Sequence, residues 1–108
     1  MESNYISMIP ERNTPVFHVS QNDDGRVIRC NLHDGIKAYT LTGSESIRVR
    51  YKKPDNSISS IGVANTSSTY VDITIPSAMT DMVGKVYCKL RIAGIGAKAF
   101  HLEVEEKT

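Results

Sequence analysis

The stretch "SIRVRYKKPDNSIS", residues 46–59, alternates apolar with basic side chains and then runs into a turn sequence. Ile47, Val49 and Tyr51 take every second position, and basic residues fill the positions between and after them. Because successive side chains of a strand point to opposite faces, this spacing predicts a strand with one buried and one wet face. Residues 54–57, Pro-Asp-Asn-Ser, have turn chemistry. The stretch therefore predicts a strand, a turn and the start of a second strand over 57–64.

The same period of two recurs along the chain. It predicts strands over 26–32, 46–52, 70–75, 85–92 and 100–105, with weaker candidates at 15–19, 38–41 and 57–64. Turn residues separate these segments, and Pro76 and Gly84 bracket a short helical turn that we expect to bridge two sheets. The pattern indicates an all-β fold: an antiparallel two-sheet β-sandwich of immunoglobulin-like architecture with seven or eight strands.

A chain of 108 residues is one domain. We assign the sandwich to residues 14–106, an N-terminal arm to residues 1–13, and a tail to residues 107–108. The arm carries apolar side chains with no obvious partner inside a small sandwich. We therefore predict that it binds a partner and is ordered only on assembly, through Tyr5, Ile6, Met8 and Ile9.

The formal net charge of +1 makes the whole molecule a weak attractor of polyanions. Arg48, Arg50 and Lys52 lie on the wet face of their strand, and we interpret this face as solvated and internally compensated. If the face binds a partner, these three residues are the candidates for contact with an acidic protein. A nucleic-acid surface formed by residues 48–53 and 85–91 is a further alternative, but the aromatic side chains that bind single strands by stacking are sparse. A second basic row, 85–91, is expected to face the acidic residues of the last strand across the ladder and be compensated by them.

No catalytic residues and no cofactor or metal site emerge from the sequence, so we expect neither an enzyme nor a small-molecule substrate. The three histidines lie on different predicted segments, and the cysteines, Cys30 and Cys88, are 58 positions apart and match no metal-ligand spacing. We expect both thiols to be buried and reduced. No apolar run is long enough for a membrane span, and the N-terminus lacks the features of a signal peptide. We expect synthesis in the cytoplasm.

The segment "DMVGKVYCKL", residues 81–90, has part of the immunoglobulin pattern around a second cysteine. Tyr87 stands one residue too late for the tyrosine corner, and the chain has no tryptophan. An immunoglobulin-like adhesion module remains an alternative, and it predicts a disulfide between Cys30 and Cys88.

A second resemblance covers about residues 14–106 and depends on the order of several short motifs. These are Gln21-Asn22-Asp23, a strand ending at Leu32, Asp34-Gly35, Leu41-Thr42-Gly43, the strand 47–51, Lys53-Pro54-Asp55-Asn56, Ile75-Pro76, Gly84-Lys85 and the strand 100–105. In this order the chain resembles the N-terminal domain of phage baseplate upper proteins. Members often have Gly after the Pro-Asp of the turn, where this chain has Asn56, which also tolerates the left-handed conformation.

The resemblance implies a structural role in the virion, in the tail baseplate of phages or prophages of Gram-positive bacteria. Such a domain docks onto other baseplate subunits and supports receptor-binding parts. The resemblance supplies no catalytic residues. The expected partners are other tail proteins, and the sequence leaves open whether the chain forms a homo-oligomer.

Overall fold

The computed structural model describes residues 5–8, 14–33, 38–42, 46–63, 68–93 and 96–106. These contain eight strands and one short 3-10 helix: β1 (Tyr5–Ser7), β2 (Val16–Ser20), β3 (Arg26–Asn31), β4 (Ile47–Lys52), β5 (Ile58–Gly62), β6 (Tyr70–Ile75), η1 (Ser77–Met79), β7 (Gly84–Ile92) and β8 (Gly96–Glu105). Within them no helix has the length and apolar character needed to cross a bilayer.

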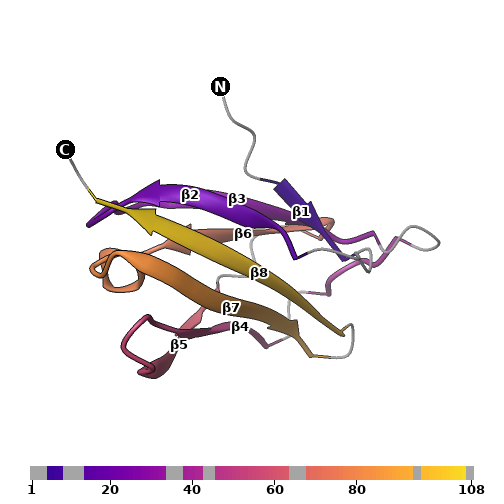
Figure 1. Cartoon of the computed structure of the whole chain (residues 1–108). Coiled ribbons are helices and arrows are strands. Elements are labelled where there is room, and N and C mark those ends of the chain that lie inside the picture. Colours follow the sequence, from indigo (N-terminus) through magenta and orange to yellow (C-terminus); the bar gives the residue numbers. More distant parts are fainter. Residues whose placement is uncertain are drawn as a thin grey trace.

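Two sheets lie face to face and enclose the core (Figure 1). One has the order β1-β3-β6, and the other has the order β2-β8-β7-β4-β5. The alternating apolar residues of both sheets point inward, as the pattern of the sequence requires. The largest fully buried side chains include Phe100, Ile28, Ile73, Ile75, Met79 and Leu90. The predicted two-sheet β-sandwich is confirmed.

The strand directions differ in part from the antiparallel arrangement that we expected. β1 runs parallel to β3, and β2 runs parallel to β8, whereas the other pairs are antiparallel. A strand joined to its neighbour by a tight turn must run antiparallel to it. β1 and β2 lie beside strands that are distant in sequence, so no turn fixes their direction.

The N-terminal segment is part of the sandwich, which corrects our interpretation of its apolar residues. Ile6 lies opposite Cys30 in the β1–β3 pair and is only 5% exposed. Met8 packs against the core, and its sulfur is 3.8 Å from the Cys30 sulfur. The prediction that these side chains lack a partner within the fold is therefore wrong for Ile6 and Met8. Ile9 lies outside the described residues.

The connection between β6 and β7 crosses from one sheet to the other, as predicted for residues 76–84. Its helical part is the short η1, which begins after Pro76 and buries Met79. Gly84 starts β7 instead of ending a helix. Its φ of 129° and a distance of 2.9 Å from an added Cβ to the Pro54 Cγ both favour glycine there.

Of the weaker strand candidates, 15–19 and 57–64 correspond to β2 and β5. The candidate at 38–41 forms no strand, and Ala38 makes only an isolated bridge to His33. In the turn after β4, Asn56 has a φ of 70°. Its left-handed conformation is the one that a three-residue hairpin loop requires at its last position, so Asn56 fits this turn as expected from its tolerance of that conformation.

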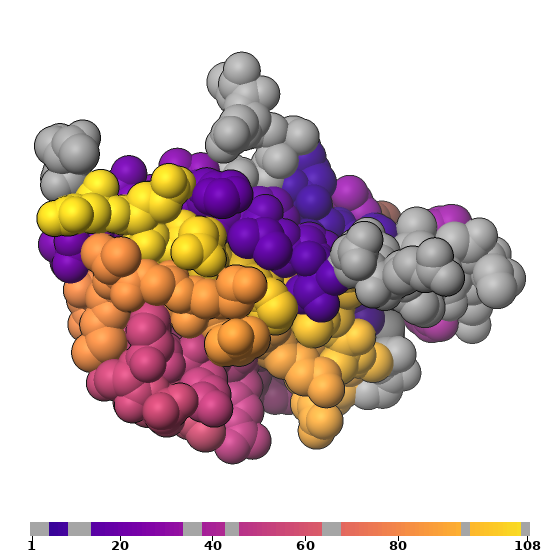
Figure 2. Space-filling model, viewed as in Figure 1, coloured from indigo at the N-terminus to yellow at the C-terminus, as the bar shows by residue number. Residues whose placement is uncertain are grey.

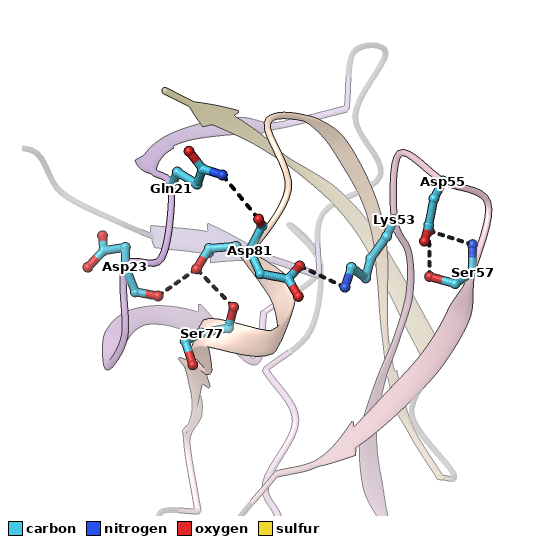
Figure 3. A network of polar contacts seen from close by, with 8 residues as sticks. Gln21, Asp23, Lys53, Asp55, Ser57, Ser77 and Asp81 are labelled. Atoms are coloured by element: carbon cyan, nitrogen blue, oxygen red, sulfur yellow. Dashed lines mark hydrogen bonds and ion pairs between the residues drawn. The ribbon is translucent and has the colours of Figure 1, made fainter. Parts of the chain in front are cut away.

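A polar network joins three turns at one end of the sandwich (Figure 3). The Thr80 hydroxyl donates to the Asp23 carbonyl at 2.6 Å, and the Gln21 amide donates to the Asp81 carbonyl at 3.2 Å. The Asp81 carboxylate accepts from the Lys53 ammonium at 2.7 Å, which raises the pKa of Lys53. The β4–β5 turn is thereby tied to the connection that links the two sheets.

Candidate functional site

The outer face of the five-stranded sheet carries a cluster of four positive charges. Arg48 and Arg50 on β4 lie beside Lys89 and Arg91 on β7, and all four side chains are exposed. We call these four residues the basic face. They point outward because Ile47, Val49, Leu90 and Ile92, which alternate with them, are buried.

The register between β4 and β7 places like charges directly opposite each other. Arg48 faces Arg91, and Arg50 faces Lys89. Directly opposed residues of an antiparallel pair have Cα atoms about 4.5–5.5 Å apart, and like charges at that spacing are destabilising. The isolated fold therefore gains no stability from this arrangement. An anion bound across the face would be attracted by all four groups.

The predicted compensation of the second basic row holds at only one position. Lys85 lies opposite Glu103 across the β7–β8 ladder, but Lys89 and Arg91 lie opposite Ala99 and Ala97. None of the four side chains of the basic face forms an ion pair with a carboxylate among the described residues. The expectation of a fully compensated face is therefore wrong for the end that bears Lys89 and Arg91.

An open groove of about 630 Å³ runs over this surface and onto β5. It is lined by the basic face together with Ile58, Ser59 and Ser60. A second hollow of about 330 Å³ continues it past Ile58, Lys89 and Tyr87. Tyr87 packs edge-on against His101, with ring centroids 4.7 Å apart. Figure 2 shows β4 and β5 as the magenta and pink lower part of the molecule, next to the orange β7.

The structure divides the predicted partner-binding residues between the two sheets. Arg48, Arg50 and Lys52 share the outer face of β4, as the alternation predicted. Tyr5, which is 57% exposed, belongs to the three-stranded sheet. Ile6 is buried in the core, so its side chain offers no contact surface. The two predicted groups do not form one site.

Two features of the surface were not among the partner-binding residues that we predicted, although Lys89 and Arg91 belong to the second basic row of the nucleic-acid alternative. Lys89 and Arg91 join the site because the register brings them to β4, and no pattern in the sequence reveals that register. The exposed strand β5 was a weak strand candidate, and its polarity, "ISSIG", was the available signal that it lies at a sheet edge.

Neither cysteine is placed for nucleophilic chemistry. Cys30 in β3 and Cys88 in β7 are both free and buried. Burial raises the pKa of Cys30 to about 11 and that of Cys88 to about 12. The described residues also contain no group of three or more His, Cys, Asp or Glu side chains that could hold a metal ion.

These thiols give a direct test of the disulfide that the adhesion-module alternative requires. Unreduced protein should show two reactive thiols in denaturant and almost none when folded. At pH 8 a thiol with a pKa of about 11 or 12 is only about 0.1% or 0.01% thiolate. Labelling of the folded protein should therefore rise with pH, because the fraction of thiolate grows about tenfold per pH unit below the pKa. Absence of free thiols in the denatured, unreduced sample would contradict this expectation.

The fold and the surface together define a small β-sandwich domain with a basic groove on one sheet. The described residues contain no catalytic arrangement. The chain is similar in structure to a phage baseplate domain, the N-terminal domain of ORF48 of phage TP901-1. The TM-score is 0.67 at 12% identity, and the match covers 97% of this chain and 99% of the phage domain. The predicted resemblance to a phage baseplate domain is therefore confirmed at the level of the fold.

Immunoglobulin domains are also found among similar structures. The IG1 domain of the ZIG-8 homodimer matches with a TM-score of 0.45 at 12% identity, over 92% of this chain and 85% of that one. A chain of the ZIG-8–RIG-5 IG1–IG1 heterodimer matches with a TM-score of 0.45 at 11% identity, over 91% and 88%. No family model matches the sequence. No curated protein matches it either.

Proposed function

We propose that this chain is a non-enzymatic structural module of a phage or prophage tail baseplate. It docks onto neighbouring baseplate subunits and supports receptor-binding parts of the tail. The observation that carries the proposal is the end-to-end likeness in fold to the phage domain, with almost all of both chains covered. A match of that extent supports the proposal because it spans the whole sandwich and is not limited to one sheet.

The chemistry of the described surface supports docking over catalysis. The exposed basic groove has the open form of a protein contact surface and is lined by arginine, a residue enriched at interfaces. The buried thiols, with their raised pKa values, are poor nucleophiles. The chain would be made in the cytoplasm of the bacterial host and reach its working place in the virion.

The test is whether the protein is a component of phage particles. Particles purified from a strain that encodes the chain should contain it by mass spectrometry, and gold-labelled antibody should mark the distal end of the tail in electron micrographs. An antibody against the capsid is the matched control and should mark heads only. Protein that stays in the lysate while particles lack it, or label on heads, would contradict the proposal.

A further inference from the structure

We propose that the free edge of β5 takes up an extended, acidic segment of a partner protein as an additional strand, whose carboxylates bind the basic face. This deepens the proposed docking function and rests on it for the class of partner, another structural protein. The binding step itself depends only on the geometry of β5 and of its neighbours.

The hydrogen-bond pattern shows which backbone groups of β5 are free. Val63 donates to the Ile47 carbonyl at 3.0 Å, and Lys53 donates to the Ser57 carbonyl at 2.9 Å. Both pairs fit the β4–β5 register, in which hydrogen-bonded and non-hydrogen-bonded pairs alternate. The backbone groups of Ser59 and Ile61 are therefore directed at β4. The backbone groups of Ile58, Ser60 and Gly62, which alternate with them, point away from the sheet.

Nothing in the described part of the chain occupies that side of β5. β5 is the last strand in the order of its sheet and lies at the lower margin of the molecule (Figure 1). Natural edge strands are usually protected by charged residues, proline or a covering segment. The strand β5, Ile-Ser-Ser-Ile-Gly, has neither charge nor proline, and Ile58 is 55% exposed. The outward N–H and C=O groups of Ile58, Ser60 and Gly62 can pair with the backbone of an added strand.

The basic face extends to this edge, so it favours an added strand that carries negative charge. The Arg48 guanidinium donates to the Ser60 hydroxyl at 2.9 Å, so it lies over β5. Ser60 and Gly62 are small, and they leave room above the edge for a neighbouring side chain. The groove connects Ser60 to the other three cations. Carboxylates on the outward face of an added strand would supply the negative charge that the described part of the chain does not place there.

Charge also argues against a second copy of this chain as the added strand. Antiparallel pairing of two β5 edges about a twofold axis puts both outer faces on the same side of one continuous sheet. Two basic faces, eight cations in all, would then share that surface. Such like-charge juxtaposition opposes association, so the partner segment must bring negative charge.

A nine-residue peptide with blocked ends, alternating glutamate and valine, is a suitable probe. Its matched control has glutamine in place of every glutamate. Binding followed by fluorescence anisotropy should be about tenfold tighter for the glutamate peptide at low salt, because its carboxylates form charge-assisted hydrogen bonds. In hydrogen exchange, the bound peptide should slow the amides of Ile58, Ser60 and Gly62. The amides of Ser59 and Ile61, which already face β4, should change little.

The pair Ser60→Pro and Ser60→Ala separates strand addition from side-chain binding. Both remove the hydroxyl that Arg48 contacts, but only proline removes the outward N–H, and proline is tolerated on an edge strand at such a position. Ser60→Pro should weaken peptide binding about tenfold relative to Ser60→Ala, because one backbone hydrogen bond is lost and its acceptor is left unpaired. Equal melting temperatures of the two variants would establish that both are folded. Arg50→Gln should reduce the preference for glutamate over glutamine and leave the exchange pattern unchanged.

Four results would overturn the inference. They are equal binding by the two Ser60 variants, no saturable binding of the glutamate peptide up to about 1 mM, tighter binding of a single-stranded oligonucleotide than of the peptide, and dimerisation of the protein that Ser60→Pro abolishes. The third would indicate a nucleic-acid surface and the fourth self-pairing. None of these results depends on where the protein resides in a phage particle, so failure here is distinguishable from failure of the proposed function.

Discussion

Replacing Phe100 with alanine is expected to lower the free energy of unfolding by about 3–5 kcal/mol. Phe100 is fully buried at the centre of β8, the strand that joins β2 to β7. Its ring meets Phe17 edge to face, with centroids 6.2 Å apart. The substitution leaves a cavity at the junction of three strands, which the surrounding side chains can fill only in part.

Urea unfolding followed by circular dichroism measures this effect. Ala99→Ser is the matched control, since Ala99 is the next residue on the same strand and points to solvent. It should change the stability by no more than about 0.5 kcal/mol. A loss of less than about 1 kcal/mol for Phe100→Ala would mean that this site can collapse around the cavity, contrary to the close packing that we infer.

Replacing Ile6 with alanine is expected to cost about 2–3 kcal/mol, the lower part of the range for burial in a core. The short strand β1 holds Ile6 against the three-stranded sheet opposite Cys30, with only 5% of the residue exposed. An arm that was free in the isolated protein would show no effect at all. The experiment therefore tests the main correction that the structure makes to the sequence analysis.

Tyr5→Ala is the control for this measurement. Tyr5 precedes Ile6 in the same strand but is 57% exposed, so its loss should alter the free energy of unfolding by about 0.5 kcal/mol or less. If Ile6→Ala and Tyr5→Ala were equally mild, the side chain of Ile6 would not contribute to the core. If Ile6→Ala alone is costly, Tyr5 remains the exposed candidate contact on this segment.

Much of the fold could be predicted because the information is local. The alternation around Val49 or Ile73 fixes which face of a strand is dry, whatever the strand's neighbours are. The Pro-Asp-Asn turn likewise depends on the dihedral preferences of the residues in it, and the left-handed conformation of Asn56 agrees with that chemistry. The segment 38–41 is the counterexample, since its short alternation found no strand to pair with beyond one bridge.

The site could be predicted only in part. Arg48 and Arg50 were assigned to a wet face from their spacing alone. Their position opposite Lys89 and Arg91 depends on the register of β7 against β4. A shift of two residues would keep every side chain on its face while changing every partner. Lys98 is a second residue whose position the sequence does not predict. It takes an inward position two residues before Phe100 and is 7% exposed, which its charge alone would not predict.

By itself, the sequence determined that this is a two-sheet β-sandwich, which residues of each strand face inward, and where the chain turns. These are consequences of side-chain alternation and of backbone preferences within a few residues. Only the tertiary structure decided that β1 and β2 run parallel to their neighbours, that Ile6 is in the core, and that four cations meet beside an open strand edge. Those features arise from contacts between segments that are distant along the chain, and a period of two carries no information about which strands become neighbours or in what register.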